Sequence, residues 1–288
     1  MSVANDEWRG RVPDDGLADR LDRWLPRLLE VSRGEARRLI DAGGVYVDGK
    51  RCRVQSRTVG PGVALRCRQD AAEVAARAAK GPQPVIVHRD DALLVVDKPP
   101  GMPTQASRTT VYGTVEAWAR ALPGVQYVAL HHRLDRDARG LLALAIDRSA
   151  NKGLAQAFGE RLATRRYRAR LEGDVDGDAG VWQHSLIERG RSRRAERFSP
   201  KRGKGMRSEW TVLDRGEGTT LVEVVLQTGR THQIRLQARA VGHPVVGDKL
   251  YGTPARGGLR LQAFALALPH PVTGEDLSFE LPVPEGFR

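Results

Sequence analysis

The chain has 288 residues, 40% of them hydrophobic, which suits a folded protein and excludes a disordered one. Lys and Arg exceed Asp and Glu by 47 to 35, and a net charge of +12 predicts a polyanionic partner such as nucleic acid. Two cysteines, Cys52 and Cys67, form no disulfide or metal-binding pattern. No apolar run approaches the roughly 18 residues of a membrane helix, and the N-terminus lacks a signal-peptide core. We therefore expect a soluble, cytoplasmic protein without membrane contact.

Residues 1–15 are expected to form a polar tail, followed by a compact unit at residues 16–68. Apolar residues at helical spacing predict a first helix: Leu17, Leu21, Trp24, Leu25 and Leu28. Ser32 and Glu35 form a capping box for a second helix, whose buried face would carry Ala36, Leu39 and Ile40. Residues 45–47, the turn Asp48-Gly49 and the run from Lys50 predict a β-hairpin.

A linker is expected at residues 69–84, before a second unit at residues 85–288. Strand candidates in this unit lie at residues 85–87, 93–96, 141–146 and 221–226. Helices are expected from Ser149, as cap, to about Arg161 and from His232 to about Val241. Strands outnumber helices and do not alternate with them regularly. This pattern predicts an α+β domain around a mostly antiparallel sheet rather than a doubly wound parallel one.

The first unit carries 12 Lys and Arg against 6 Asp and Glu. Its candidate phosphate-binding residues lie off the apolar face of the second helix and after the hairpin turn: Arg33, Arg37, Arg38, Lys50 and Arg51. An ordinary solvated helix face, with Glu35 and Asp41 as partners of these arginines, is an alternative that charge alone leaves open. The segments 20–22, 32–33, 39–40 and 43–50 resemble the alpha-L RNA-binding motif shared with a small-subunit ribosomal protein. The resemblance implies that this unit binds RNA.

Asp135 lies in the segment His132-Arg133-Leu134-Asp135-Arg136, in a turn between two apolar runs. Neighbouring arginines would keep its carboxylate ionised, and an ionised carboxylate in such a position is a candidate nucleophile. Taken by itself, an aspartate among arginines is more often a structural ion pair. The segment resembles the HRLD motif of RluA-type pseudouridine synthases, in which that aspartate is required to isomerise uridine. Ala138-Arg139 replace the usual Thr-Ser of the family.

The segment 226–235 predicts a strand, a glycine turn and a helix start whose free N–H groups could hold an anion. Together with residues 242–248 and 251–252 it resembles a second motif of the same family. The resemblance implies that Arg235 pairs with the catalytic aspartate; a phosphate contact or a surface charge are the alternatives. His232 is expected to be structural, because no second metal ligand has helical spacing to it. Gln237 and Gln262 replace histidines that are frequent in the family.

Tyr167, in the strand-like segment 166–173, resembles the tyrosine of a third family motif. An aromatic ring can stack on an unpaired base, so the resemblance implies that Tyr167 contacts the target uracil and is a candidate for assisting loss of the C5 proton. A core tyrosine is the alternative. Residues 96–102 match the strand and turn that open the family's domain. The matches follow the family order from about residue 85 to residue 262.

The resemblances together imply a pseudouridine synthase that acts on ribosomal or transfer RNA, with Asp135, Tyr167 and Arg235 as catalytic residues. By analogy with the family, Arg133 would fill the place that the flipped uridine leaves in the stack. We expect a monomer that needs no cofactor and no metal. The alternative is a non-catalytic RNA-binding or ribosome-assembly factor on a synthase-derived fold. The basic run at residues 189–207 predicts a flexible loop, either closing over RNA or merely solubilising.

Overall fold

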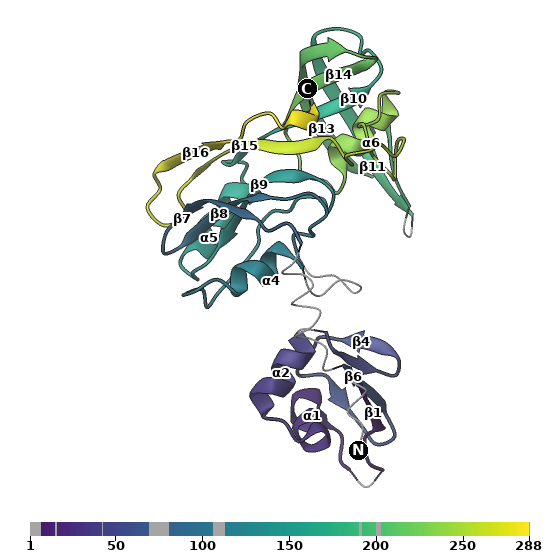
Figure 1. The fold of residues 1–288 in the computed structure, drawn as a ribbon, viewed down its shortest axis with the longest axis vertical. Coiled ribbons are helices and arrows are strands. Elements are labelled where there is room, and N and C mark those ends of the chain that lie inside the picture. The colour runs from purple at the N-terminus through teal and green to yellow at the C-terminus, as the bar shows by residue number, and fades with distance from the viewer. Residues whose placement is uncertain are drawn as a thin grey trace. The chain divides into compact units, whose positions relative to one another are not determined.

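The computed structural model describes residues 7–14, 16–41, 43–68, 81–105, 113–189, 192–199 and 203–287. They form two compact units, the first made chiefly of residues up to Pro82 and the second of residues from Gln83 onward (Figure 1). Most of the expected linker, residues 69–80, lies outside the described residues. Among the described residues, no helix is long and apolar enough to span a membrane.

The first unit contains the two helices and the hairpin that the sequence predicts. Its elements are β1 (Glu7–Arg11), β2 (Asp19–Arg20), α1 (Leu21–Leu29), α2 (Arg33–Asp41), β3 (Val45–Val47), β4 (Lys50–Cys52), β5 (Thr58–Val59) and β6 (Ala64–Arg68). Four strands form an antiparallel sheet in the order β1-β6-β3-β4. The helices supply Leu21, Leu25, Ala36 and Ile40 to its core, all fully buried. Their helical spacing is the signal that predicted both helices.

The expected polar tail contains a strand, which local sequence did not indicate. Residues 7–11 form β1, whose register pairs Trp8 with Cys67 of β6, and Val12 directly after it is buried in the core of the unit. This strand depends on pairing with a segment more than fifty residues later in the chain, and so its own composition does not reveal it. Leu17 is 87% exposed, because α1 begins only at Leu21.

The second unit is built on one large sheet with few helices, as predicted. Its strands are β7 (Val85–Arg89), β8 (Leu93–Lys98), β9 (Arg139–Ala145), β10 (Thr164–Glu172), β11 (Ala179–Arg189), β12 (Ser192–Arg197), β13 (Lys204–Gly216), β14 (Thr219–Leu226), β15 (Leu261–Pro269) and β16 (Asp276–Glu280). The order is β12-β11-β13-β14-β10-β15-β9-β8-β7, and β16 pairs with β15. Among these described strands only β9 and β15 run parallel. The helices are α4 (Val115–Arg120), α5 (Ala150–Gly159), α6 (Gln233–Ala240) and the 3-10 helix η1 (Glu285–Phe287).

Strands β8 and β9 are buried on both faces of the sheet. Leu94 and Leu142 belong to the apolar cluster that includes α4, whereas Leu93 and Leu141 belong to the cluster that includes α5. Successive side chains of a strand point to opposite faces, and continuous apolar runs follow from burial on both. Gly140 of β9 has φ +116°, and a Cβ there would lie 2.2 Å from the carbonyl oxygen of Ala263 on β15. Only glycine permits this close approach. The loop preceding β9 is thereby held at the centre of the sheet.

The basic run at residues 189–207 is not a flexible loop where it is described. Strand β12 pairs with β11 from Arg189↔Ser192 to His184↔Arg197, and β11 also pairs with β13. Residues 190, 191 and 200–202 lie outside the described residues. Arg193 and Lys204 both bind Glu188. These pairs reduce repulsion between the charges of the run, so high charge did not prevent strand pairing here.

The expected cap of α5 is also different. The side chain of Ser149 makes no capping hydrogen bond to the helix. Its hydroxyl instead donates to Asp147 Oδ1 at 2.6 Å, and the same carboxylate oxygen accepts from its backbone N–H at 2.8 Å. Asp147 therefore organises the turn before the helix, since a short carboxylate can bond the backbone two residues on.

Candidate active site

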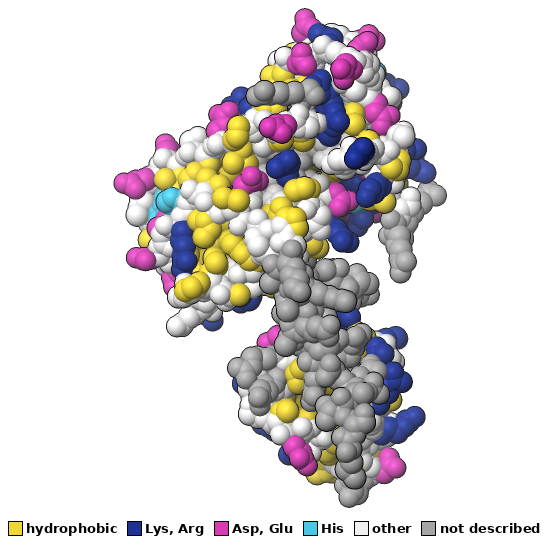
Figure 2. All heavy atoms as spheres, in the orientation of Figure 1, with side chains coloured by type: hydrophobic (Ala, Val, Ile, Leu, Met, Phe, Trp, Pro, Cys, Tyr) yellow, Lys and Arg dark blue, Asp and Glu magenta, His cyan; other side chains and the backbone are white. Residues whose placement is uncertain are grey.

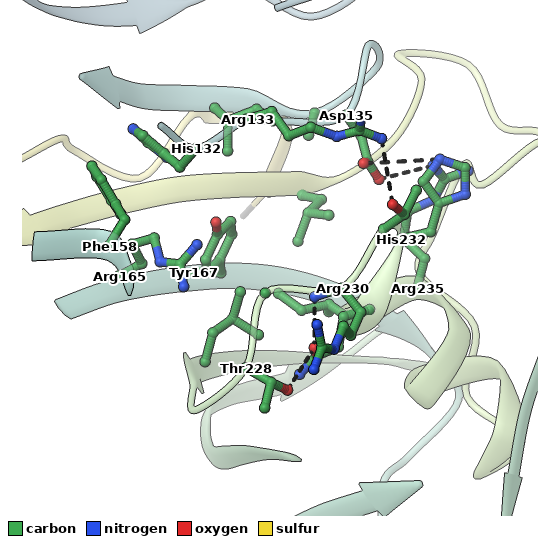
Figure 3. Close-up of a pocket in the computed structure, with 18 of the residues that line it drawn as sticks. His132, Arg133, Asp135, Phe158, Arg165, Tyr167, Thr228, Arg230, His232 and Arg235 are labelled. Atoms are coloured by element: carbon green, nitrogen blue, oxygen red, sulfur yellow. Dashed lines mark hydrogen bonds and ion pairs between the residues drawn. The ribbon is translucent and has the colours of Figure 1, made fainter. Parts of the chain in front are cut away.

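A cleft of about 610 Å³ lies on the second unit (Figure 3). Three segments supply most of its lining: the loop before β9 with Leu130 to Asp135, strand β10 with Arg165 and Tyr167, and the stretch from Leu226 at the end of β14 to Arg235 in α6. These segments are far apart in sequence, and the sheet order places β10 between β14 and β15. All three residues expected to be catalytic thus line one cleft.

Asp135 and Arg235 form an ion pair in this cleft. Arg235 Nη1 donates to Asp135 Oδ2 at 3.0 Å, and the side chains are 5% and 15% exposed for Arg235 and Asp135 respectively. The other two nitrogens of the guanidinium donate to Asp248: Nε to Oδ2 and Nη2 to Oδ1, both at 2.7 Å. Asp248 is fully buried and accepts further hydrogen bonds from the backbone N–H groups of Leu250 and Tyr251. Asp248, which sequence reasoning did not single out, therefore fixes the guanidinium that faces Asp135.

The Arg235 guanidinium lies between two carboxylates, and this arrangement shifts the pKa values of Arg235 and Asp248. Burial opposes the charge of Arg235, yet its hydrogen bonds to Asp248 and the field of Asp135 outweigh that effect and raise its pKa. Burial would raise the pKa of Asp248, but the hydrogen bond from Arg235 and those from the backbone lower it overall. Both groups remain charged at neutral pH. One guanidinium edge is thus presented to Asp135 as a permanent positive charge.

A buried lysine, Lys98, binds the loop that carries Asp135. Lys98 is fully buried, and its ammonium donates to the carbonyl oxygens of Pro99 at 2.9 Å, Met102 at 2.8 Å and Arg136 at 3.1 Å. Burial lowers the pKa of Lys98 to about 8, against the opposing field of Asp135. The contact to Arg136 ties the residue next to Asp135 to the segment after β8. Residues 96–102 thus support the loop that carries Asp135, which agrees with the sequence-based expectation of a strand and turn at the start of the domain.

A second contact fixes the other side of Asp135. Thr104 is buried, and its hydroxyl donates to the carbonyl oxygen of Leu134 at 2.8 Å and accepts from the N–H of the same residue at 3.1 Å. Both backbone groups of Leu134 are satisfied by one side chain. The backbone on each side of Asp135 is therefore anchored, which limits the positions that its carboxylate can take.

Tyr167 is 5% exposed and lies on β10 among the core residues of the second unit, while its ring lines the cleft (Figure 3). Burial raises its pKa, and the charge of Arg165 partly opposes that effect. Its hydroxyl is thus a neutral donor at physiological pH. The tyrosine thus packs in the core, as the alternative had it, and also lines the cleft, while its contact with a uracil stays a prediction.

His132 is an anchor rather than a reactive group. Its Nε2 accepts from the backbone N–H of Ala143 at 2.9 Å, and its ring stacks on Phe158 with centroids 4.1 Å apart. Burial lowers its pKa to about 3, so the ring is neutral. The contact with Ala143 fastens the start of the catalytic loop to β9.

His232 lies nearer to Asp135 than sequence reasoning anticipated. Its Nε2 is 3.9 Å from Asp135 Oδ1, and its Nδ1 is 2.8 Å from the hydroxyl of Tyr251. Burial lowers its pKa, while the charge of Asp135 acts in the opposite direction. The spacing of three residues between His232 and Arg235, one helical turn, is the signal that places both side chains on the same face. Among the described residues, no group of candidate ligands could hold a metal ion.

Arg133 lies at the exposed edge of the cleft, where its Nη2 is 3.4 Å from the hydroxyl of Thr231. This contact joins the loop before β9 to the turn before α6.

Comparison with known proteins identifies the family. Residues 92–240 match the model for RNA pseudouridylate synthase, and residues 19–65 match the S4 domain. The chain belongs to the RNA pseudouridylate synthase family. Ribosomal large subunit pseudouridine synthase C of Escherichia coli is 31% identical over 96% of this chain and 93% of its own length. Dual-specificity RNA pseudouridine synthase RluA of Pasteurella multocida is 35% identical over 68% of this chain and 92% of its own length.

A solved structure agrees with this result. Human RNA Pseudouridylate Synthase Domain Containing 1 superposes with a TM-score of 0.58 and 27% identity, over 69% of this chain and 83% of its own. The chain is therefore an RNA pseudouridine synthase with an N-terminal S4 RNA-binding domain, and RNA is its substrate.

Of the positions where the synthase departs from the family pattern, Gln237 and Gln262 do not border the cleft, whereas Ala138 does. Gln237 is fully buried; its Oε1 accepts from Ser208 Oγ at 2.7 Å, and its Nε2 donates to the carbonyl oxygen of Trp182 at 3.0 Å. Gln262 Nε2 donates to the carbonyl oxygen of Pro282 at 3.1 Å. Each glutamine thus has hydrogen-bonded partners of its own in the scaffold. Ala138 does border the cleft, where it is 2% exposed.

The S4 domain presents part of the expected basic surface. The fully buried carboxylate of Asp22 binds Arg20 Nε at 2.9 Å, Arg33 Nη2 at 3.0 Å and Arg37 Nε at 2.9 Å. The hydrogen bond from Arg20 and those from the other two arginines lower the pKa of Asp22 despite its burial. All three guanidinium groups remain about 40–46% exposed. One buried acid therefore gathers three half-exposed cations on one surface.

The remaining expected RNA-binding residues have different surroundings. Arg51 Nη2 donates to the hydroxyl of Tyr46 at 2.6 Å, and its guanidinium lies 5.2 Å from the centre of that ring. Lys50 is exposed. The side chain of Arg38 lies outside the described residues. Asp41, the expected partner of helix arginines, instead accepts from Gln55 Nε2 at 2.9 Å and 2.8 Å, so Arg33 and Arg37 are held by Asp22.

Proposed function

We propose that Asp135 is the carboxylate with which this synthase isomerises uridines of large-subunit ribosomal RNA. The supporting observation is the 3.0 Å contact between Asp135 and Arg235 in a cleft that is also bordered by Tyr167. Relatives in Escherichia coli and Nitrosomonas europaea, both 31% identical, are named ribosomal large subunit pseudouridine synthases. These names support ribosomal RNA, rather than transfer RNA, as the substrate. We further propose that the enzyme acts as a monomer in the cytoplasm.

The target uridine must leave its stack to reach Asp135, which costs a few kcal/mol of unstacking. Stacking of the uracil on the ring of Tyr167 offsets part of that cost, about 1–3 kcal/mol. Arg133, exposed at the edge of the cleft, occupies the vacated place in the RNA. Arg33, Arg37, Arg38, Lys50 and Arg51 of the S4 domain hold phosphates elsewhere on the same RNA.

The reaction conserves atoms and electrons. The Asp135 carboxylate attacks either the ribose C1′ or the uracil ring, and the bond between C1′ and N1 breaks. The base turns within the cleft, C5 bonds to C1′, and the carboxylate is released. C5 then loses its proton and N1 gains one. Arg235 orients the Asp135 carboxylate for attack, and the hydroxyl of Tyr167 assists the C5 proton transfer. An isomerisation of this kind needs no redox cofactor and no metal.

The domain boundaries proposed for this activity are 16–68 for the S4 domain and 85–288 for the catalytic domain. Residues 7–11 are added to the first, because β1 completes its sheet.

Release of tritium from [5-³H]uridine-labelled, in vitro transcribed large-subunit ribosomal RNA tests the proposal. Asp135→Asn is expected to lower turnover by at least about four orders of magnitude while the Kd for the RNA stays within about threefold. Asp137→Asn, a carboxylate two residues further on that does not border the cleft, is the matched control and should retain activity. Appreciable tritium release by Asp135→Asn would remove Asp135 from the catalytic role.

A further inference from the structure

A second cavity, of about 490 Å³, lies between β12 and α6. Ten described residues line it: Ser192, Arg193, Arg194, Ala195, His232, Leu236, Arg239, Ala240, Leu250 and Tyr251. Three of them are arginines, and none of these lining residues is Asp or Glu. Figure 2 shows Lys and Arg side chains gathered on this side of the second unit, around α6. A concave surface with this charge attracts anions, because low-dielectric walls focus the field of the arginines.

Two of the three guanidinium groups keep donors for a ligand. Arg193 binds Glu188 through Nε at 3.0 Å, and Arg239 donates through Nη1 to the carbonyl oxygen of Tyr251 at 2.7 Å. Within the described part of the chain, the two terminal nitrogens of Arg193 and the Nη2 of Arg239 have no other hydrogen-bond partner. Arg194 differs, since Glu196 binds both its Nε and its Nη2. The first two arginines are thus oriented but not saturated, as an anion site requires.

His232 is the wall that this cavity shares with the active-site cleft. It lines both spaces. Its Nε2 lies 3.9 Å from Asp135 Oδ1 on one side, while its Nδ1 contacts the hydroxyl of Tyr251 at 2.8 Å on the other. The second cavity therefore begins one side chain away from the carboxylate. A nucleotide whose base enters the cleft keeps its phosphodiester links, so a phosphate of the strand must pass close outside the cleft.

We propose that the cavity between β12 and α6 binds an RNA backbone phosphate next to the target uridine, through Arg193 and Arg239. The proposal rests on the proposed role of Asp135, because that role puts the uracil on the other side of His232. It also assigns a task to the basic strand β12, which packs against α6 and brings Arg193 to this position. Phosphate contacts of this kind fix the position of the RNA without reading its sequence.

The test compares Arg193→Gln/Arg239→Gln with Arg256→Gln, which removes an exposed arginine outside both cavities. Binding of in vitro transcribed large-subunit ribosomal RNA is measured over a range of salt concentrations. Each phosphate that loses its contact lowers the slope of log K against log salt by about 0.7–0.9, so the double variant, which loses this one phosphate, should lose about 0.7–0.9. KM should rise about tenfold or more, while the rate at saturating RNA stays within about twofold. Arg193→Lys/Arg239→Lys should recover most of the slope, because lysine also holds phosphate.

Equal salt slopes and KM values for the double Gln variant and Arg256→Gln would overturn the proposal. So would a loss of slope that the Lys variant fails to recover, since that result indicates a structural role. Both arginines lie at the surface, and thermal unfolding checks that each variant is folded. The binding measurement needs no turnover, so it tests the phosphate site even if Asp135→Asn proves active. The two proposals can therefore fail separately.

Discussion

Asp248 offers the sharpest test of how the catalytic pair is held. It does not border the cleft, so a substitution there reaches the reaction through the groups that Asp248 holds, first among them the Arg235 guanidinium. Asp248→Asn removes the charge and replaces one acceptor oxygen by a donor, and one of the two 2.7 Å hydrogen bonds to Arg235 is lost. Removing one partner of a buried ion pair costs about 3–5 kcal/mol of stability. Arg235 is 5% exposed and has Asp135 as its only other carboxylate partner among the described residues, so the guanidinium is expected to shift.

The expected effect on catalysis is about a 100-fold fall in the rate at saturating RNA, comparable with loss of one preorganised donor in other active sites. KM should change little, because Asp248 is not exposed to RNA. Asp248→Glu keeps the charge and should restore part of the rate. Leu268→Ala, a core truncation in β15 expected to cost about 2–5 kcal/mol, is the control for lost stability. Tritium release is assayed well below the melting temperature of both variants. If Asp248→Asn and Leu268→Ala have the same rate, Asp248 does not position Arg235 for catalysis.

Three further predictions concern the groups that hold the site. Burial lowers the pKa of His132 to about 3 in the folded chain, against 6.5 in the unfolded one. Between pH 3 and pH 6.5 the ring is therefore protonated in the unfolded chain and neutral in the folded one. The stability due to its neutral ring is present above pH 6.5 and falls as the pH drops, by about 3 kcal/mol at pH 4.5. Urea unfolding of wild type and His132→Gln at neutral pH and at pH 4.5 should show this difference, and an equal change in both proteins would contradict it. Lys98→Met removes three hydrogen bonds to loop carbonyls. Differential scanning calorimetry should show a lower Tm, and activity assays should show a lower turnover. An unchanged turnover would show that the loop keeps Asp135 in place without Lys98. If the hydroxyl of Tyr167 assists proton transfer, Tyr167→Phe should keep the Kd for RNA and lower the rate about 100-fold. Tyr167→Leu should also weaken RNA binding, because it removes the ring. A Phe variant as active as wild type would leave only the stacking role.

Much of this enzyme could be predicted from local sequence. The helices at Leu21–Leu29 and Arg33–Asp41 follow from apolar spacing, and the hairpin follows from Asp48-Gly49 between two short β runs. These signals act over a few residues and need no distant partner. The motifs around Asp135, Tyr167 and Arg235 were recognised because their residue types and order resemble those of one family, and the family matches agree.

Other features came only from contacts between distant segments. Strand β1 forms because Trp8 and its neighbours pair with β6, and β12 forms because β11 pairs with it despite the net positive charge of β12. Asp248 lies in a segment whose resemblance to the family was recognised, but its role appears only in the structure, where its carboxylate lies 2.7 Å from Arg235.

The amino-acid sequence alone determined the kinds of side chain available for the reaction and the local elements that carry them. Tertiary structure decided which of these side chains lie in contact. Asp135 and Arg235 are one hundred residues apart in the chain, yet Arg235 Nη1 lies 3.0 Å from Asp135 Oδ2. The physical reason is that β-sheet pairing and buried ion pairs are non-local. Their free energy depends on which segments pack together, and no property of a single segment contains that information.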